Sequence, residues 1–138
     1  MTLAPPPPTK LAGVSRVRIV GIGASAGGLE ALEQFLGHVP PGCGLAFIVV
    51  QHLDPTQKAM LAQLLQRSTA MPVGEATEGT RIAAGRVYVI PPNRALTVSR
   101  GSLHLAAPEQ PRGLRLPVDV LFESLALELQ EQAIGVVL

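Results

Sequence analysis

Residues 17–28 read VRIVGIGASAGG, a short β-branched run that continues directly into a glycine-rich turn. The apolar run Val17–Gly21 predicts a buried strand. Leucines and a phenylalanine then recur at helical spacing over Gly28–Gly37, which predicts a helix with Gly37 as its C-cap. The stretch is therefore typical of a strand, a tight turn and a helix in immediate succession.

The same alternation of strand and helix continues along the chain. Residues 45–51 form a second apolar run and predict a second strand. Asp54 is expected to cap a helix over about residues 55–67, with Pro55 at its first position and an apolar face made of Met60, Leu61, Leu64 and Leu65. Further extended pieces are expected at 72–76, 86–90, 95–99 and 103–106, a tight hairpin turn at Arg100-Gly101, a helix at 118–130 and a strand at 133–138.

Buried strands that alternate with helices predict an α/β fold. We expect a doubly wound, mostly parallel, Rossmann-like sheet with one antiparallel hairpin. Residues 1–15 are expected to form a flexible, proline-rich tail, and residues 16–138 one domain. In open α/β sheets, binding and chemistry gather beyond the carboxyl ends of the strands. The candidate site therefore lies at residues 21–28, at residues 51–54 and after Leu138.

The composition narrows the class of protein. Of the 138 residues, 47% are apolar and the formal net charge is +1, so the chain can bury a core and lacks the basic excess of a nucleic-acid-binding protein. The longest apolar run, Leu45–Val50, is far shorter than the roughly 20 residues of a membrane-spanning helix. The single cysteine, Cys43, excludes an internal disulfide. A cytoplasmic protein without membrane insertion is expected.

The glycine-rich turn carries the main candidate site. The residues Gly23-Ala24-Ser25-Ala26-Gly27 fit the G-x-S-x-G pattern of a nucleophile elbow, in which small neighbours let the backbone fold back on itself. The N–H of Ala26 and the start of the helix would then stabilise an oxyanion. A dinucleotide-binding pattern, Gly21-x-Gly23-x-x-Ala26, overlaps the same turn. A glycine turn with a bystander serine is the third possibility, whereas a P-loop is excluded because no Gly-Lys-Ser/Thr follows.

His52 favours the nucleophile interpretation. It stands at the predicted carboxyl end of the second strand, where a dinucleotide site would need an acid, and on the same sheet edge as Ser25. A histidine there can act as general base toward Ser25 and then as general acid toward the leaving alkoxide, although it can also merely cap a strand or helix. His38 and His104 are expected in exposed positions without a functional role. The pair His52-x-Asp54 lacks an evident third ligand, so no metal is expected.

Five blocks of sequence, in order, resemble one family. They are IVGIGASAGGLE at 19–30, IVVQHLDP at 48–55, VYVIPPN at 87–93, RGLRLPVDVL at 112–121 and AIGVVL at 133–138. They resemble the CheB chemotaxis protein-glutamate methylesterase domain, and most closely the variant in CheB/CheR hybrid sensory proteins. The resemblance implies hydrolysis of glutamate methyl esters on chemoreceptors, and also glutamine deamidation in some members. It implies Ser25 as nucleophile, His52 as catalytic histidine, no cofactor, and chemoreceptor helices and a CheR-type methyltransferase domain as partners.

The resemblance also implies a third catalytic residue, an aspartate in a glycine-rich loop directly after the strand at 133–138. Neither Asp54 nor Asp119 matches it, so residues 16–138 are expected to be the N-terminal portion of the domain, with apolar surface exposed around Val136–Leu138. Loss of the triad acid can lower the rate on the order of 10⁴-fold, so a slow esterase is expected. A receptor-interaction module with little or no catalysis remains the alternative, and a dinucleotide-binding domain is less favoured.

Overall fold

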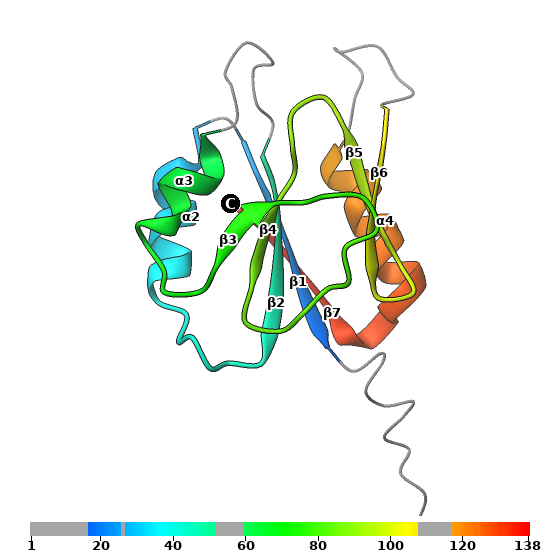
Figure 1. The fold of residues 1–138 in the computed structure, drawn as a ribbon, viewed down its shortest axis with the longest axis horizontal. Helices are drawn as coiled ribbons and strands as arrows, with labels where there is room; N and C mark the ends of the chain where they lie inside the picture. Colours follow the sequence, from blue (N-terminus) through cyan, green and yellow to red (C-terminus); the bar gives the residue numbers. More distant parts are fainter. Residues whose placement is uncertain (1–16, 26, 52–59, 108–116) are drawn as a thin grey trace, which may run out of the picture.

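The computed structural model describes residues 17–25, 27–51, 60–107 and 117–138 (Figure 1). Its strands are β1 (Arg18–Ala24), β2 (Leu45–Gln51), β3 (Val73–Glu75), β4 (Val87–Val89), β5 (Ala95–Ser99), β6 (Ser102–Ala106) and β7 (Ala133–Val137). Its helices are α2 (Leu29–Gly37), α3 (Leu61–Gln66) and α4 (Pro117–Leu129), followed by the short 3-10 helix η2 (Gln130–Gln132). Five strands form a parallel sheet in the order β3-β4-β2-β1-β7, and β5 and β6 form an antiparallel hairpin. The predicted fold class is confirmed.

Both faces of the parallel sheet are covered (Figure 1). Helices α2 and α3 lie on one face, and α4 and the β5–β6 hairpin lie on the other. Successive side chains of β2 alternate between these two layers: Phe47 and Val49 pack toward α2 and α3, whereas Ile48 and Val50 pack toward α4 and the hairpin. Burial on both sides explains the uninterrupted apolar run of this strand.

Glycines in β1 allow α4 to pack directly on the sheet. A Cβ atom at Gly21 would lie 2.7 Å from Leu125 Cδ1, and one at Gly23 would lie 2.5 Å from Val118 Cγ1. Both distances are shorter than any sterically allowed carbon contact, so a larger residue would push the helix away from the strand. The glycines of the quoted stretch therefore serve helix packing as well as the turn.

The β5–β6 hairpin has the predicted turn. Arg100 and Gly101 adopt φ angles of 54° and 78°, the left-handed conformation that both central residues of a two-residue type I′ turn require. Leu96, Val98 and Leu103 are buried, because the hairpin forms part of the layer that covers the sheet. Its antiparallel register pairs Ser99 with Ser102 beside the turn.

Two local expectations about the helices are wrong. Gly37 is the last residue of α2, and the C-cap is His38 with an ordinary φ of −99°, so no left-handed glycine ends this helix. Met60 is the N-cap of α3 and is 55% exposed, and the helix buries only Leu61 and Leu65. The predicted cap and first turn of that helix, Asp54 to Pro55, and the tail at residues 1–15 lie outside the described residues.

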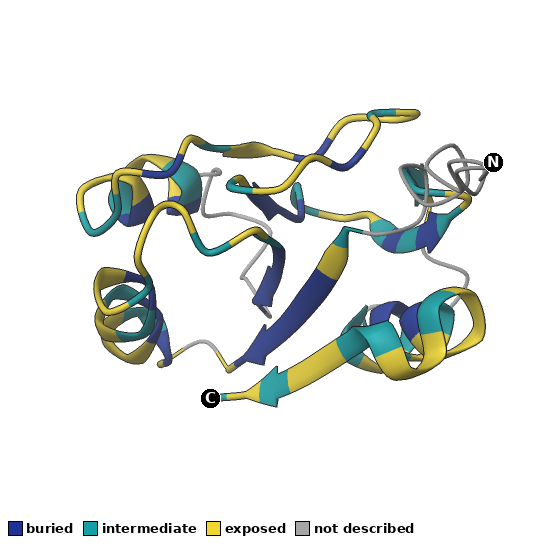
Figure 2. Ribbon diagram, turned by 90° about the horizontal axis from the view of Figure 1, so that it is seen from below, coloured by how far each residue is buried: buried dark blue, intermediate teal, exposed yellow. Residues whose placement is uncertain are grey.

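Strand β7 is one of the two edge strands of the parallel sheet, and it is largely exposed (Figure 2). Val137 is 74% exposed and Ile134 is 42% exposed. Val136 and Leu138, however, are half-buried and pack against the layer that contains α2. The prediction of exposed apolar surface around Val136–Leu138 is thus confirmed only for Val137, because its two neighbours are half-buried.

Replacement of Gly23 by alanine is expected to lower the free energy of unfolding by about 1–3 kcal/mol, because the new methyl group would overlap Val118. Gly74→Ala is the matched control, since Gly74 also lies in a strand but a Cβ there would contact no atom within 4 Å. Urea unfolding of both variants measures the difference. Equal midpoints for the two variants would show that α4 can shift without loss of stability.

Candidate active site

The strand topology indicates that a ligand site would lie at the carboxyl ends of β1, β2 and β7. Strand β1 pairs with β2 on one side and with β7 on the other, and all three strands are parallel. The chain leaves β1 into α2 on one face of the sheet and reaches β7 from α4 on the opposite face. Ligands of open α/β sheets bind beyond the carboxyl ends of the strands where the winding changes direction in this way. Ser25 follows β1 directly and therefore lies at this position.

Ser25 begins a tight turn that joins β1 to α2. Its carbonyl oxygen accepts a hydrogen bond of 2.9 Å from the Gly28 N–H. Gly28 is buried, and a Cβ there would lie 3.1 Å from Ala24 Cβ and 3.2 Å from Ser25 O, so the inner side of the turn is tightly packed. Ser25 and Gly27 are exposed, and a Cβ at Gly27 would contact nothing within 4 Å. The turn presents the serine to solvent.

The start of α2 adds a positive electrostatic potential beside Ser25. The helix has nine residues, and its N-cap, Gly28, offers no side chain to the first-turn N–H groups. Such unsatisfied N–H groups and the helix dipole favour a negative charge at the N-terminal end. The surroundings of Ser25 are therefore suited to a reaction that develops an oxyanion.

Strand β2 contributes a buried amide to the same edge. Gln51 is 5% exposed, and its Nε2 donates a hydrogen bond of 3.0 Å to the backbone carbonyl of Ser25. The strands are in register here, because Ala24 pairs with Gln51. The sequence pattern predicts no such role for Gln51. The signal that could have found it is a lone polar residue at the end of an otherwise apolar, fully buried strand.

Two of the predicted site residues, Ala26 and His52, lie outside the described residues. His52 follows Gln51 directly in the sequence. Of the other histidines, His38 is exposed as predicted, and its Nδ1 lies 2.7 Å from the Gln34 carbonyl. In the part of the chain that the structure describes, no three His, Cys, Asp or Glu side chains form a group that could hold a metal ion.

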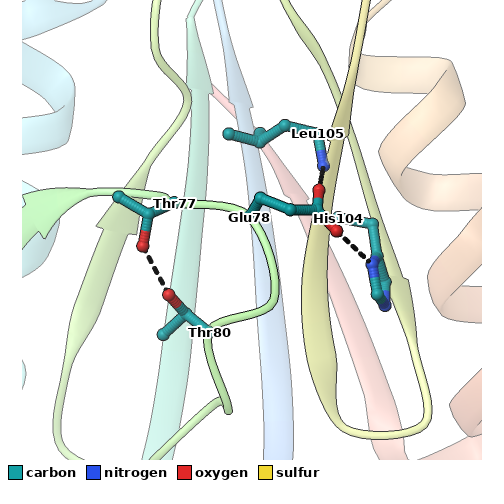
Figure 3. A network of polar contacts seen from close by, with 5 residues as sticks. All are labelled: Thr77, Glu78, Thr80, His104 and Leu105. Atoms are coloured by element: carbon teal, nitrogen blue, oxygen red, sulfur yellow. Dashed lines mark hydrogen bonds and ion pairs between the residues drawn. The ribbon is translucent and has the colours of Figure 1, made fainter.

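A second polar cluster connects the loop after β3 to the hairpin (Figure 3). The Glu78 carboxylate accepts hydrogen bonds from the Leu105 N–H at 2.7 Å and from His104 Nδ1 at 3.0 Å. Thr77 and Thr80 share a hydroxyl hydrogen bond in the same loop. The His104 side chain is 42% exposed, in agreement with the predicted solvent-facing position. Since both partners lie at the surface, we interpret these hydrogen bonds as a structural link between the loop after β3 and the hairpin.

The hydrogen bonds to Glu78 also change its acidity. The Leu105 amide and, to a lesser extent, the His104 side chain stabilise the ionised carboxylate and lower the pKa of Glu78 below its ordinary value of 4.5. The carboxylate is thus charged over the whole neutral pH range, where it keeps the hydrogen bonds that link the loop to the hairpin.

An apolar groove with a volume of about 340 Å³ lies at the opposite end of β1 from Ser25. Val17 and Ile19 line it together with Val98 and Leu129. At its rim, the Arg100 N–H donates a hydrogen bond of 2.9 Å to Glu128. None of the described lining residues of this groove is a serine, cysteine or histidine, so we assign no catalytic role to it.

The fold and the serine turn match a known family. The family model for the CheB methylesterase matches residues 20–138. This chain belongs to the CheB methylesterase family. Among its relatives, a protein-glutamate methylesterase/protein-glutamine glutaminase from Rhizobium etli is 40% identical to this CheB-family chain over 140 residues. A protein of the same description from Treponema pallidum is 36% identical over 126 residues.

The solved structures agree. The CheB methylesterase catalytic domain of Thermotoga maritima superposes with a TM-score of 0.77 at 27% identity, and the match covers 88% of this chain and 66% of that one. The match to the Rhizobium etli protein covers 99% of this chain and 40% of that protein, so the CheB-family chain spans less than half the length of this relative. The predicted family is confirmed. None of the described helices has the length and hydropathy needed to span a membrane.

Neutralising Glu78 is expected to lower the urea midpoint at about pH 7 and to have a vanishing effect in acid. The folded pKa lies below the unfolded one, so the carboxylate stabilises the folded state above pH 4.5, and this contribution is lost as the pH falls through the folded pKa. Unfolding of the unmodified chain and of Glu78→Gln, from about pH 7 to about pH 3, measures this. Glu75→Gln, an exposed carboxylate of β3, controls at about pH 7 for the loss of one surface charge. A difference in urea midpoint between Glu78→Gln and the unmodified chain that stays constant with pH would contradict a lowered pKa of Glu78 in the folded state.

Proposed function

We propose that this chain carries the nucleophile and the catalytic histidine of a protein-glutamate methylesterase. The observation that carries the proposal is the exposed Ser25 in a tight strand-to-helix turn at the carboxyl end of β1, in a chain of the CheB methylesterase family. Ser25 is the nucleophile, His52 is the general base, and the Ala26 N–H with the start of α2 stabilises the oxyanion. No metal or organic cofactor takes part in these steps.

The reaction then proceeds by acyl transfer. Ser25 Oγ attacks the γ-carbonyl of a methylated glutamate while His52 accepts the hydroxyl proton. The tetrahedral intermediate collapses, His52 returns the proton to the departing methoxide, and methanol leaves. Water, activated by His52, hydrolyses the acyl-enzyme to release the glutamate carboxylate and the free serine. A glutamine substrate would follow the same path with ammonia as the leaving group.

The strand register supports the pairing of Ser25 with His52. Ala24 and Gln51 are Cα partners of neighbouring parallel strands, and Ser25 and His52 are the residues that follow them in sequence. Two residues that leave adjacent parallel strands at the same level start from the same edge of the sheet. This register supports our proposal that His52 acts as the general base toward Ser25.

The end of β7 supports a position for the third catalytic residue. The Leu138 N–H donates a hydrogen bond of 2.9 Å to the carbonyl of Gly23, two residues before Ser25. An aspartate in a segment that follows β7 would therefore start beside the Ser25 turn and could orient the imidazole of His52. Asp119 lies in the first turn of α4, and we assign it no catalytic role.

The substrate that we propose is a helical segment of a chemoreceptor in the cytoplasm. Relatives named protein-glutamate methylesterase/protein-glutamine glutaminase support both the ester and the amide reaction. The exposure of Ser25 and Gly27, where an added Cβ would meet no described atom within 4 Å, supports access of a side chain that protrudes from a protein surface. A CheR-type methyltransferase domain, which adds the methyl groups, is the proposed functional counterpart.

Ser25→Ala is expected to abolish release of methanol from a methylated chemoreceptor fragment and to leave the melting temperature nearly unchanged, because Ser25 is exposed. A fluorophosphonate should label the unmodified chain at Ser25, as located by mass spectrometry. Ser68→Ala, which removes a half-buried serine hydroxyl just after α3, is the control. Ser25 would be excluded as the nucleophile if Ser25→Ala retained more than a tenth of the activity of the unmodified chain. If the unmodified chain were not labelled but still bound the receptor, the result would favour an interaction module.

His52→Ala is expected to slow the fluorophosphonate reaction of Ser25 on the order of 10²–10⁴-fold, since a serine hydroxyl without a base is a weak nucleophile. His38→Ala is the matched control, because His38 is exposed and caps the opposite end of α2 from the Ser25 turn. The two rate constants are compared at one pH near neutrality. Equal rates for His52→Ala and His38→Ala would show that another group activates the serine.

A further inference from the structure

We infer that Gln51 is a positioning residue for the nucleophile, whose buried side-chain amide fixes the backbone carbonyl of Ser25. The inference rests on the proposed role of Ser25. Gln51 touches the turn through the hydrogen bond of 3.0 Å from its Nε2 to Ser25 O, which joins residues 26 positions apart in the chain.

The burial of Gln51 requires an explanation. It is 5% exposed at the end of β2, where the preceding residues Ala46–Val50 are all completely or almost completely buried. A buried amide is unfavourable unless its polar atoms are hydrogen-bonded, and an apolar side chain of similar size would fill the same space without that requirement. The contact with Ser25 therefore accounts for an amide at this place better than packing does.

The Ser25 carbonyl receives two hydrogen bonds from two directions. The Gly28 N–H, at 2.9 Å, closes the turn from within, and the Gln51 amide ties the same oxygen to the neighbouring strand. A carbonyl oxygen has two lone pairs, so these two donors use its full capacity. The bond from Gly28 fixes the shape of the turn, whereas the bond from Gln51 fixes its orientation relative to β2.

This anchor bears on the reaction in two ways. The Ser25 carbonyl shares a planar peptide group with the next N–H, which points in the opposite direction in a trans peptide. Holding the carbonyl against Gln51 thus restricts rotation of the peptide group to which the proposed oxyanion donor belongs. Gln51 also directly precedes His52, so a single residue couples the turn that carries the nucleophile to the strand that leads to the proposed base.

The test replaces the amide without changing the size of the side chain. Gln51→Met lacks the donor, and a misplacement of reacting groups by about 1 Å can lower a rate on the order of 10²-fold. We expect the fluorophosphonate reaction of Ser25 to slow at least about 10-fold, hydrogen exchange of the Gly28 amide to accelerate, and kcat for methyl-ester hydrolysis to fall with little change in KM. Val49→Ala, at a fully buried position of the same strand, controls for loss of stability and is expected to keep the labelling rate.

Gln51→Glu provides a second variant. Its ionised carboxylate cannot donate to Ser25 O, but the protonated carboxyl can. We therefore expect its labelling rate, relative to the unmodified chain at the same pH, to rise as the pH is lowered, which a purely structural defect would not produce. Two outcomes would overturn the positioning role alone, provided that the unmodified chain is labelled normally. In the first, Gln51→Met is labelled as fast as the unmodified chain. In the second, Val49→Ala is slowed as much as Gln51→Met. An unmodified chain that is not labelled at all would refute the proposed function and the positioning role together.

Discussion

The parallel pairing of β1 with β2 is the constraint on which the rest of the structure depends. It aligns Ala24 with Gln51 and so brings the two strands to the same level at their carboxyl ends. Ser25 and the buried amide of Gln51, to which we give roles in the proposed chemistry, come together only because this register holds. A shift by one residue would reverse the side-chain directions and place Gln51 on the opposite face of the sheet.

Glycines in β1 and β7 let helix α4 pack close to the sheet. Gly21 of β1 is the Cα partner of Gly135 of β7, and Phe122 of α4 packs across both of them, at 3.2 Å from the place of either Cβ. Val118 packs in the same way on Gly23, two residues before the proposed nucleophile, Ser25. The position of α4 is therefore set by contact with the strand that ends at Ser25, so core packing and the geometry of the site are coupled through β1.

Polar groups have two different energetic roles in this molecule. Gln51 is buried, so the loss of its hydrogen bond would leave an amide without solvent to replace the partner. Glu78 is exposed, and water screens its interaction with His104, so its contacts contribute less to stability and mainly hold a loop against β6. The first contact serves the proposed chemistry, and the second maintains the hairpin that covers one face of the sheet.

The amino-acid sequence by itself determined the features that depend on neighbours along the chain. The strands, the glycine turn at Ser25 and the left-handed turn at Arg100-Gly101 follow from periodicity and local backbone freedom, and the ordered sequence blocks indicated the family. Only the tertiary structure decided that Met60 is exposed and that Gln51 holds the Ser25 carbonyl. Strand order and register, which bring together residues 26 positions apart, arise from packing between distant segments, and no local pattern of residue types encodes that distance.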